Sequence, residues 1–165
     1  MTRTLMIGSA LAVAVTILAG CGGSSASSDQ RIERDAALFQ IDQIEQTWQK
    51  AASTHNVNLM MTLWAPSAVF NIGAETLTGK AQIRKFFATK NAAFMPGHRW
   101  ESDTPSYKIR TAVTGNKGTL YFECHYIDIK SGKAVSVVGV DHNVQKINGK
   151  WLIVDSTGEI ASLSQ

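Results

Sequence analysis

Asp141 is the residue of this sequence whose expected surroundings best suit a chemical role. Two turn signals, Ser131-Gly132 and Asn148-Gly149, separate three long segments rich in β-branched and aromatic residues. If each turn has two residues, Asp141 shares one face of a sheet with Phe122 and Val154, because side chains alternate along a strand. Burial among such neighbours disfavours a charged carboxylate, and a neutral carboxyl can donate a hydrogen bond.

The sequence leaves three roles open for Asp141. The first is structural, as an acid bonded to Asn143, Ser156 or backbone donors, or exposed at a strand end. The second is recognition of a ligand. The third is general acid–base catalysis, and Asp141 is the catalytic residue that the sequence suggests.

The same turns divide the remaining side chains of the sheet between two faces. We expect a one-residue register slip to exchange the faces. The more apolar face, expected to line a pocket, carries Leu120, Phe122, Cys124, Tyr126, Val137, Gly139, Asp141, Leu152, Val154 and Ser156. The opposite face, expected to be exposed or to contact a second subunit, carries Tyr121, Glu123, His125, Val138, Val140, His142, Ile153 and Asp155.

Glu123, His125 and His142 are the residues that a metal site would use. With these turns His142 lies four residues along the sheet from His125, or about 13 Å at 3.3 Å per residue. Ligands of a zinc ion lie about 2 Å from it, so we expect no metal site. Cys124 points away from His125 and is predicted to be a small buried hydrophobe, and no cofactor is expected.

The N-terminal segment resembles a bacterial lipoprotein signal peptide. Arg3 precedes an uncharged apolar run over residues 5–19, which is short for a membrane-spanning helix but typical of a signal-peptide core. Leu18-Ala19-Gly20-Cys21 is similar to the lipobox, in which the cysteine thiol receives the lipid. The alternative is an ordinary secretory signal followed by a chance cysteine. We expect lipidation of Cys21 and a protein anchored on the non-cytoplasmic side of a bacterial envelope membrane, with inner and outer membrane both open.

Three parts of the chain follow from this interpretation. Residues 1–20 form the signal peptide, residues 21–29 the lipidated cysteine and a flexible Gly/Ser tether, and residues 30–165 one folded domain. Loss of Arg3 reduces the formal net charge from +3 to about +2, and like charges do not cluster. A nucleic-acid partner is therefore not expected, because such proteins need a concentrated basic patch.

The domain is predicted to be helical first and sheet afterwards. A first helix is expected from an apolar stripe at helical spacing, formed by Ala37, Ile41, Ile44, Trp48 and Ala51. A second helix is expected over residues 57–64, capped by Asn56 and closed by Pro66, then a strand at 68–72 and a third helix after Thr78-Gly79. Further strands are expected at residues 98–104, 107–113, 119–129, 134–146 and 151–160, which is an α+β pattern.

This order of elements resembles the SnoaL-like, nuclear-transport-factor-2-like superfamily over residues 41–160. Residues 77–87 (LTGKAQIRKFF) are similar to its G-x-x-x-I-x-x-F helix, and residues 148–153 (NGKWLI) to its closing G-[K/R]-W-x-I strand. The resemblance implies a cone-shaped, strongly curved, mostly antiparallel sheet packed on three N-terminal helices, and a homodimer through the outer sheet face. It also implies an apolar pocket inside the cone, here lined by Trp48, Trp64, Phe70, Asn71, Phe86, Phe122, Tyr126, Asp141 and Val154.

The ketosteroid isomerases of that superfamily use a protonated aspartate, and Asp141 stands at the matching position. Asn71 stands where their carboxylate base would be and cannot accept the proton, and Trp48 stands where their helical tyrosine would be. We therefore expect a membrane-tethered, non-catalytic module that binds a small apolar ligand or a protein partner. The alternative is a SnoaL-like isomerase, cyclase or hydratase that uses Asp141.

Overall fold

Three helices and a seven-stranded sheet make up the protein, for which the computed structural model describes residues 28–95 and 100–162. The helices are α1 (Ser28–Ser53), α2 (Val57–Met61) and α3 (Lys80–Thr89), with short 3-10 turns η1 (Ala92–Phe94) and η2 (Ser106–Lys108). The strands are β1 (Trp64–Ile72), β2 (Glu75–Thr78), β3 (Trp100–Asp103), β4 (Arg110–Thr114), β5 (Lys117–Asp128), β6 (Ala134–Ile147) and β7 (Lys150–Ser162).

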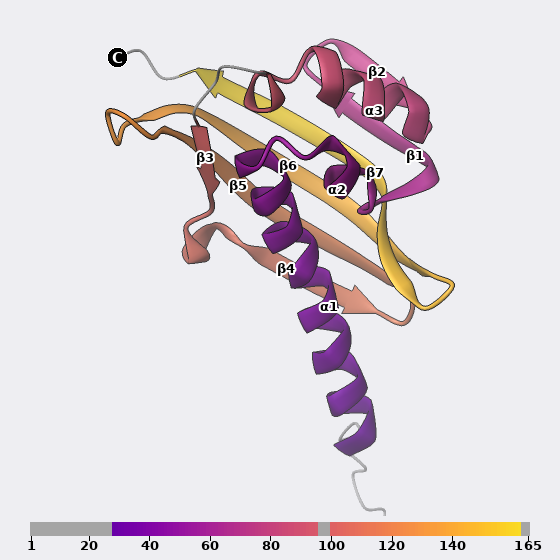
Figure 1. Ribbon diagram of the computed structural model, residues 1–165. Helices are drawn as coiled ribbons and strands as arrows, with labels where there is room; N and C mark the ends of the chain where they lie inside the picture. The colour runs from indigo at the N-terminus through magenta and orange to yellow at the C-terminus, as the bar shows by residue number, and fades with distance from the viewer. Residues whose placement is uncertain (1–27, 96–99, 163–165) are drawn as a thin grey trace, which may run out of the picture.

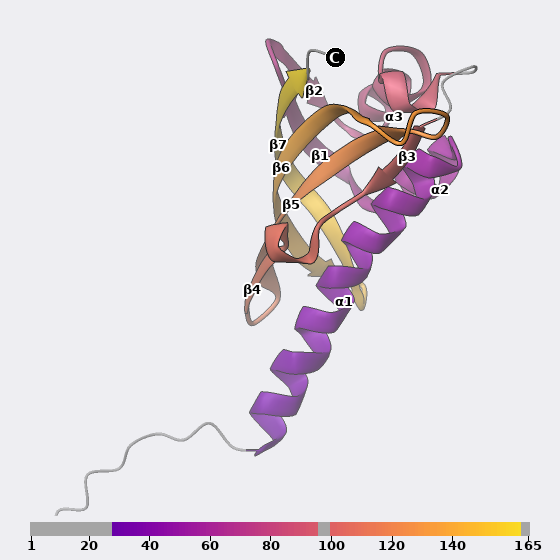
Figure 2. The same ribbon diagram turned by 90° about the vertical axis from the view of Figure 1, so that its left-hand side faces the viewer.

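The sheet is mostly antiparallel and strongly curved. Its strand order is β2-β1-β7-β6-β5-β3, with β4 also paired to β5, and only the β1–β7 pairing is parallel. In Figures 1 and 2 the three helices lie on one side of the sheet, and α1 crosses its concave face. The predicted α+β cone with three N-terminal helices is confirmed.

The apolar stripe of α1 faces the sheet as its spacing predicts. Ile41, Ile44, Trp48 and Ala51 are buried, whereas Ala37 is only half-buried. The helix begins at Ser28, so the last two residues of the expected tether are helical. The side-chain oxygen of Asn56 accepts a hydrogen bond from the Leu59 amide at 2.9 Å, and the expected N-cap of α2 is therefore confirmed.

Pro66 does not close a helix, which corrects that prediction. Helix α2 ends at Met61, and Trp64 already begins strand β1 because it pairs with Ile153 of the parallel strand β7. Pro66 lies in the irregular stretch of that pairing, where a residue without an amide hydrogen is tolerated. Strand β2, which continues the chain after the turn at Gly73, was not predicted.

The register between β5 and β6 also differs from the prediction. The connecting loop has four residues between Asp128 and Lys133, not two, and Gly132 takes a positive φ of 67° in it. A further irregularity follows Tyr126, so that Phe122 pairs with Val140 instead of Asp141. This one-residue slip exchanges the two faces of β6 and turns Val138, Val140 and His142 inward.

The turn between β6 and β7 follows the prediction. Asn148 and Gly149 both have positive φ, 49° and 80°, and Ile147 pairs with Lys150. The register then shifts by one residue at Val154, so that Ile153 and Ser156 both point into the core.

Candidate functional site

The interior of the cone is packed with aromatic rings. Trp48 contacts Phe87 and Phe122 edge-on, with ring centroids 5.5 and 5.6 Å apart. Phe70 stacks on Phe87 at 6.0 Å, and Trp64 lies 5.2 Å from Phe70. These five rings are at most 2% exposed, so side chains fill the space where the sequence predicts a pocket.

His142 lies among these rings on the inner face of β6. Its ring centroid is 5.1 Å from that of Phe122 and 5.3 Å from that of Trp48. Neither ring nitrogen has a hydrogen-bond partner among the described residues, and the same holds for the hydroxyl of Ser156, which pairs with His142 across the strands. Burial lowers the pKa of His142 to about 3, so the imidazole is neutral in the folded protein at neutral pH.

A groove with a volume of about 430 Å³ opens where the aromatic filling ends, and we call it the mouth groove. It is bordered by the end of β1, strand β2, the C-terminal end of α3, η1, strand β3 and the ends of β5, β6 and β7, in the upper part of Figure 1. Its lining includes the apolar side chains Ile72, Phe86, Trp100, Tyr126, Val135, Val138 and Ile160.

The rim of the mouth groove carries one ion pair. The Lys90 ammonium lies 2.7 Å from a Glu75 carboxylate oxygen, which links the end of α3 to strand β2. Asn91 and Ser136 supply uncharged polar groups beside it. The two opposite charges of the rim neutralise each other, so the groove offers an apolar lining with a nearly neutral edge.

The expected pocket residues separate into three groups. Trp48, Trp64, Phe70 and Phe122 belong to the packed interior, whereas Phe86 and Tyr126 line the mouth groove.

The remaining three expected pocket residues, Asn71, Val154 and Asp141, lie elsewhere. Asn71 alternates with buried neighbours on β1, and its side-chain oxygen accepts a hydrogen bond from Thr76 at 2.8 Å. Val154 is the extra residue at the irregularity of β7 and is half-buried.

Asp141 is exposed, and its expected place in a pocket is wrong. The residue pairs with Tyr121 and Thr157, so its side chain points to the outer face of the sheet. The cause is the irregularity after Tyr126, which shifts the pairing of β6 by one residue; the two additional loop residues alone would have kept the same face of β6 inside. The acid that the catalytic alternative requires inside the cone is therefore outside it.

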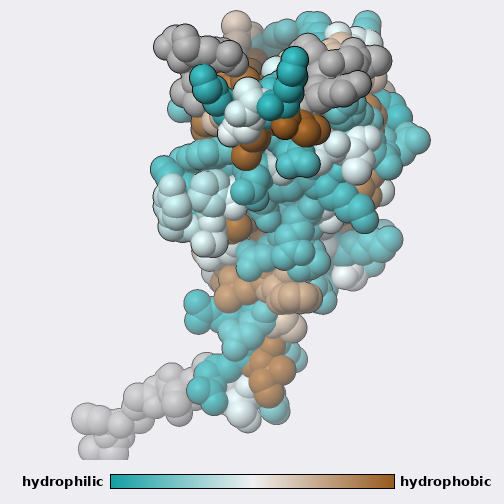
Figure 3. Space-filling view, turned by 60° about the vertical axis from the view of Figure 1, so that its left-hand side comes forward, coloured by the Kyte–Doolittle hydropathy of each residue, from teal (hydrophilic) through white to brown (hydrophobic). Residues whose placement is uncertain are grey.

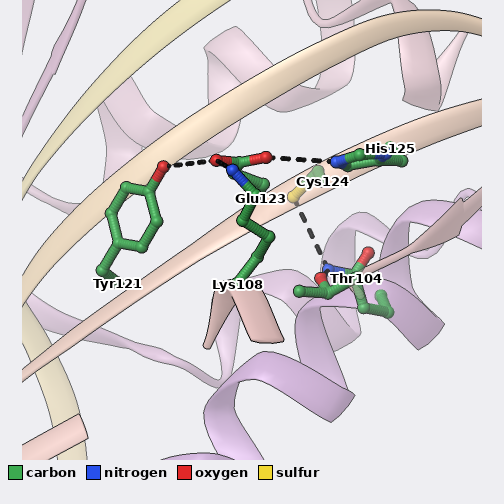
Figure 4. A network of polar contacts seen from close by, with 7 residues as sticks. Thr104, Lys108, Tyr121, Glu123, Cys124 and His125 are labelled. Atoms are coloured by element: carbon green, nitrogen blue, oxygen red, sulfur yellow. Dashed lines mark hydrogen bonds and ion pairs between the residues drawn. The ribbon is translucent and has the colours of Figure 1, made fainter. Parts of the chain in front are cut away.

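A charged network occupies the outer face instead (Figure 4). Glu123 receives a hydrogen bond from the Tyr121 hydroxyl at 2.8 Å and ion-pairs with Lys108 at 2.9 Å. The Nε2 atom of His125 lies 3.2 Å from its second carboxylate oxygen. The guanidinium of Arg110 lies 3.9 Å from the centroid of the Tyr121 ring. The hydrogen bonds from Lys108 and Tyr121 lower the pKa of Glu123 to about 2.

We predict that Lys108→Met raises the pKa of Glu123 from about 2 toward its ordinary 4.5, because the hydrogen bond from Lys108 is the main cause of the lowering. Carbon-detected NMR titration of the Glu123 carboxyl measures this change. Lys130→Met, at the exposed loop, is the matched control and should leave the titration unchanged. A wild-type carboxyl that titrates near 4.5 would contradict the network.

A second polar cluster joins α1 to the sheet. The Gln49 side-chain amide donates to Thr104 and, at 3.7 Å, to the thiol of Cys124, and its oxygen accepts a hydrogen bond from Ser102. Cys124 is a free, buried cysteine whose pKa burial raises to about 12, so the thiol stays protonated. Burial also raises the pKa of Glu45, the buried carboxyl of α1 near this cluster. These contacts hold α1 against strand β3.

Sequence reasoning missed the inward position of His142 and the contribution of Trp100, Val138 and Ile160 to the mouth groove. Asp128, whose carboxylate accepts hydrogen bonds from Ser131, signals a β5–β6 loop longer than two residues. The irregularity after Tyr126, which turns His142 inward, has no comparable signal in the sequence. Within residues 28–95 and 100–162, no three His, Cys, Asp or Glu side chains are grouped to hold a metal ion. None of the helices in these ranges has the length and apolar character required to cross a bilayer.

The curved sheet, the helix across it and the groove at its open end define an α+β cone of the nuclear-transport-factor-2-like class. A family described as the SnoaL-like domain matches residues 44–153, more than half of the chain. The chain belongs to this family.

Several solved structures share the fold. An NTF2-like protein from Novosphingobium aromaticivorans has a TM-score of 0.66 and 14% identity over 82% of this chain and 88% of its own. An NTF2-like protein of unknown function from Pseudomonas putida has a TM-score of 0.66 and 11% identity over 76% and 87%. An NTF2-like superfamily protein from Salmonella enterica has a TM-score of 0.62 and 16% identity over 79% and 94%. No curated protein sequence matches the chain.

Proposed function

We propose that this protein is an envelope-tethered, non-catalytic binding module whose mouth groove holds a small apolar ligand. The observation that carries the proposal is the groove of about 430 Å³ with its apolar lining at the open end of an otherwise filled cone. Binding sites for small molecules are typically concave and mostly apolar, with few polar groups.

The charges around the groove favour a neutral ligand. Lys90 and Glu75 are paired with each other, so their opposite charges largely cancel and favour neither an anionic nor a cationic head group. The third titratable group of the described lining is Tyr126, whose pKa burial raises well above its ordinary value. No described lining residue combines a free carboxylate or imidazole with access to the groove, which supports binding over acid–base catalysis.

The envelope tether is proposed from the sequence of the N-terminal segment. Cys21 lies in the lipobox-like segment, outside the described residues, and its lipidation would hold the domain at the membrane. Mass spectrometry of the N-terminal peptide tests this: a peptide that begins at a diacylglyceryl-modified Cys21 is expected, and a free thiol there contradicts it. A homodimer through the outer sheet face stays a prediction.

The groove is tested with N-phenyl-1-naphthylamine, a neutral apolar fluorophore. We expect saturable one-to-one binding to the full chain and displacement by 1-decanol. Ile160→Glu should weaken the binding at least about tenfold, which corresponds to about 1.4 kcal/mol. Ile160 is 59% exposed at the groove, so a charge there should disturb the ligand more than the fold.

Asp141→Asn is the matched control, since Asp141 lies on the outer face of the sheet. It should leave the affinity for the fluorophore unchanged. Equal binding to the wild type and to Ile160→Glu would contradict the mouth groove as the site. Loss of binding in Asp141→Asn would contradict it as well and would favour the outer face.

A further inference from the structure

The N-terminal half of α1 projects from the body of the protein. We call residues 28–40 the arm; buried residues of α1 begin only at Ile41. At 1.5 Å per residue, these 13 residues extend over about 20 Å. Figures 1 and 2 show the arm continuing beyond the sheet, and Figure 3 shows hydrophobic side chains along it.

The outer side of the arm carries two large apolar side chains. Ile32 is 66% exposed and Phe39 is 65% exposed, and they lie two helical turns apart on the same side of α1, with the exposed Ala36 between them. Ile41 lies two residues, or about 200°, beyond Phe39 and faces the core. The apolar outer side therefore points away from the protein's own core.

The inner side of the arm packs loosely on the body. Two crevices of about 360 and 400 Å³ lie between the arm and the β4–β5 turn at Gly115. Glu33 and Ala37 line both of them. A helix of about 13 residues is marginally stable in water without such packing, so a second contact on its outer side would stabilise it.

The proposed tether would hold a membrane close to the arm. Six residues, Gly22 to Ser27, separate Cys21 from the first residue of α1. The seven Cα–Cα steps limit the distance from Cys21 to Ser28 to about 25 Å. This limit holds for a lipid on Cys21. If the apolar run of residues 5–19 were retained as the anchor, the nine steps from Ala19 to Ser28 would give a limit of about 32 Å.

We propose that the outer side of the arm lies on the bilayer surface, with Ile32 and Phe39 at the boundary between head groups and acyl chains. The inference rests on the proposed tether. Arg31 and Arg34 are offset by three acidic residues of the arm, so the contact depends on apolar insertion and not on attraction to anionic lipids.

The test uses the full chain reconstituted in phosphatidylcholine vesicles with brominated acyl chains, which quench tryptophan within the bilayer. Phe39→Trp should be quenched at least threefold more than Ile129→Trp, after correction for the wild-type chain. Ile129 is the matched control because it is 55% exposed on the distant β5–β6 loop. High salt and added phosphatidylglycerol should leave this difference unchanged.

Hydrogen exchange of the arm gives an independent measure. We expect arm amides to exchange at least fivefold more slowly on vesicles than in detergent, and Ile32→Ser/Phe39→Ser to abolish the difference. Equal quenching of the two tryptophan variants overturns the arm contact. So does arm-to-arm disulfide formation by Ile32→Cys without quenching of Phe39→Trp, because a second copy then covers the face.

Flotation separates this inference from the tether on which it rests. A chain that floats with the vesicles but shows no quenching at position 39 contradicts the arm contact alone. A chain that does not float contradicts both the tether and the arm contact. Neither result bears on ligand binding in the mouth groove.

Discussion

The His142→Leu variant should lose much less stability in acid than the wild-type protein. The pKa of His142 is about 3 in the folded protein, below the ordinary 6.5 that applies to the unfolded chain. Above pH 6.5 the imidazole is neutral in both states. As the pH falls from 6.5 toward 3, the unfolded chain binds a proton that the folded protein refuses, so the free energy of unfolding falls.

The size of this effect follows from the linkage. Each pH unit in that window costs the wild type about 1.4 kcal/mol, so the difference between wild type and His142→Leu should change by about 3 kcal/mol between pH 7 and pH 4. Urea unfolding at several pH values measures this difference. The pH dependence contributed by the carboxyl groups cancels in the comparison, because both proteins have the same carboxyl groups. Parallel stability curves for the two proteins would show that His142 is protonated, or solvated, in the folded state.

Phe87→Ala should produce the largest loss of stability among single truncations in the cone, about 3–5 kcal/mol. Phe87 is fully buried and contacts five other aromatic rings, those of Trp48, Trp64, Phe70, Phe86 and Phe94. Removal of its ring leaves a cavity at the centre of this cluster, which the β-sheet on one side and α1 on the other cannot close.

Chemical unfolding of Phe87→Ala against Ile129→Ala measures this cost. Ile129 is 55% exposed, and its truncation should change the free energy of unfolding by less than about 0.5 kcal/mol. A loss below about 1 kcal/mol in Phe87→Ala would mean that the interior of the cone is loosely filled. The interior itself would then be a candidate ligand site.

The helices and the class of fold were predictable because their signals are local. The stripe of α1, the Asn56 cap and the Asn148-Gly149 turn each depend on residues close in sequence, and each has the expected structure. The parallel β1–β7 pairing was not predictable, because no turn connects those strands.

The candidate site was less predictable because it depends on register. The two additional loop residues before Lys133 keep the expected face of β6 inside, and the one-residue irregularity after Tyr126 reverses it. As a result Asp141 lies at the surface and His142 in the core, and the residues next to them in the sequence do not signal this. The mouth groove combines residues of eight elements that span most of the described chain, and its volume depends on how far the aromatic rings fill the cone.

The most direct test of the proposed function is native mass spectrometry of the full chain, purified gently from the cells that produce it. We predict a small neutral, apolar adduct on the wild-type protein that is displaced by 1-decanol and absent from Ile160→Glu, with Asp141→Asn retaining it. An adduct carried equally by the wild type and Ile160→Glu, or a wild-type chain that neither retains an adduct nor takes up 1-decanol, would contradict ligand binding in the mouth groove.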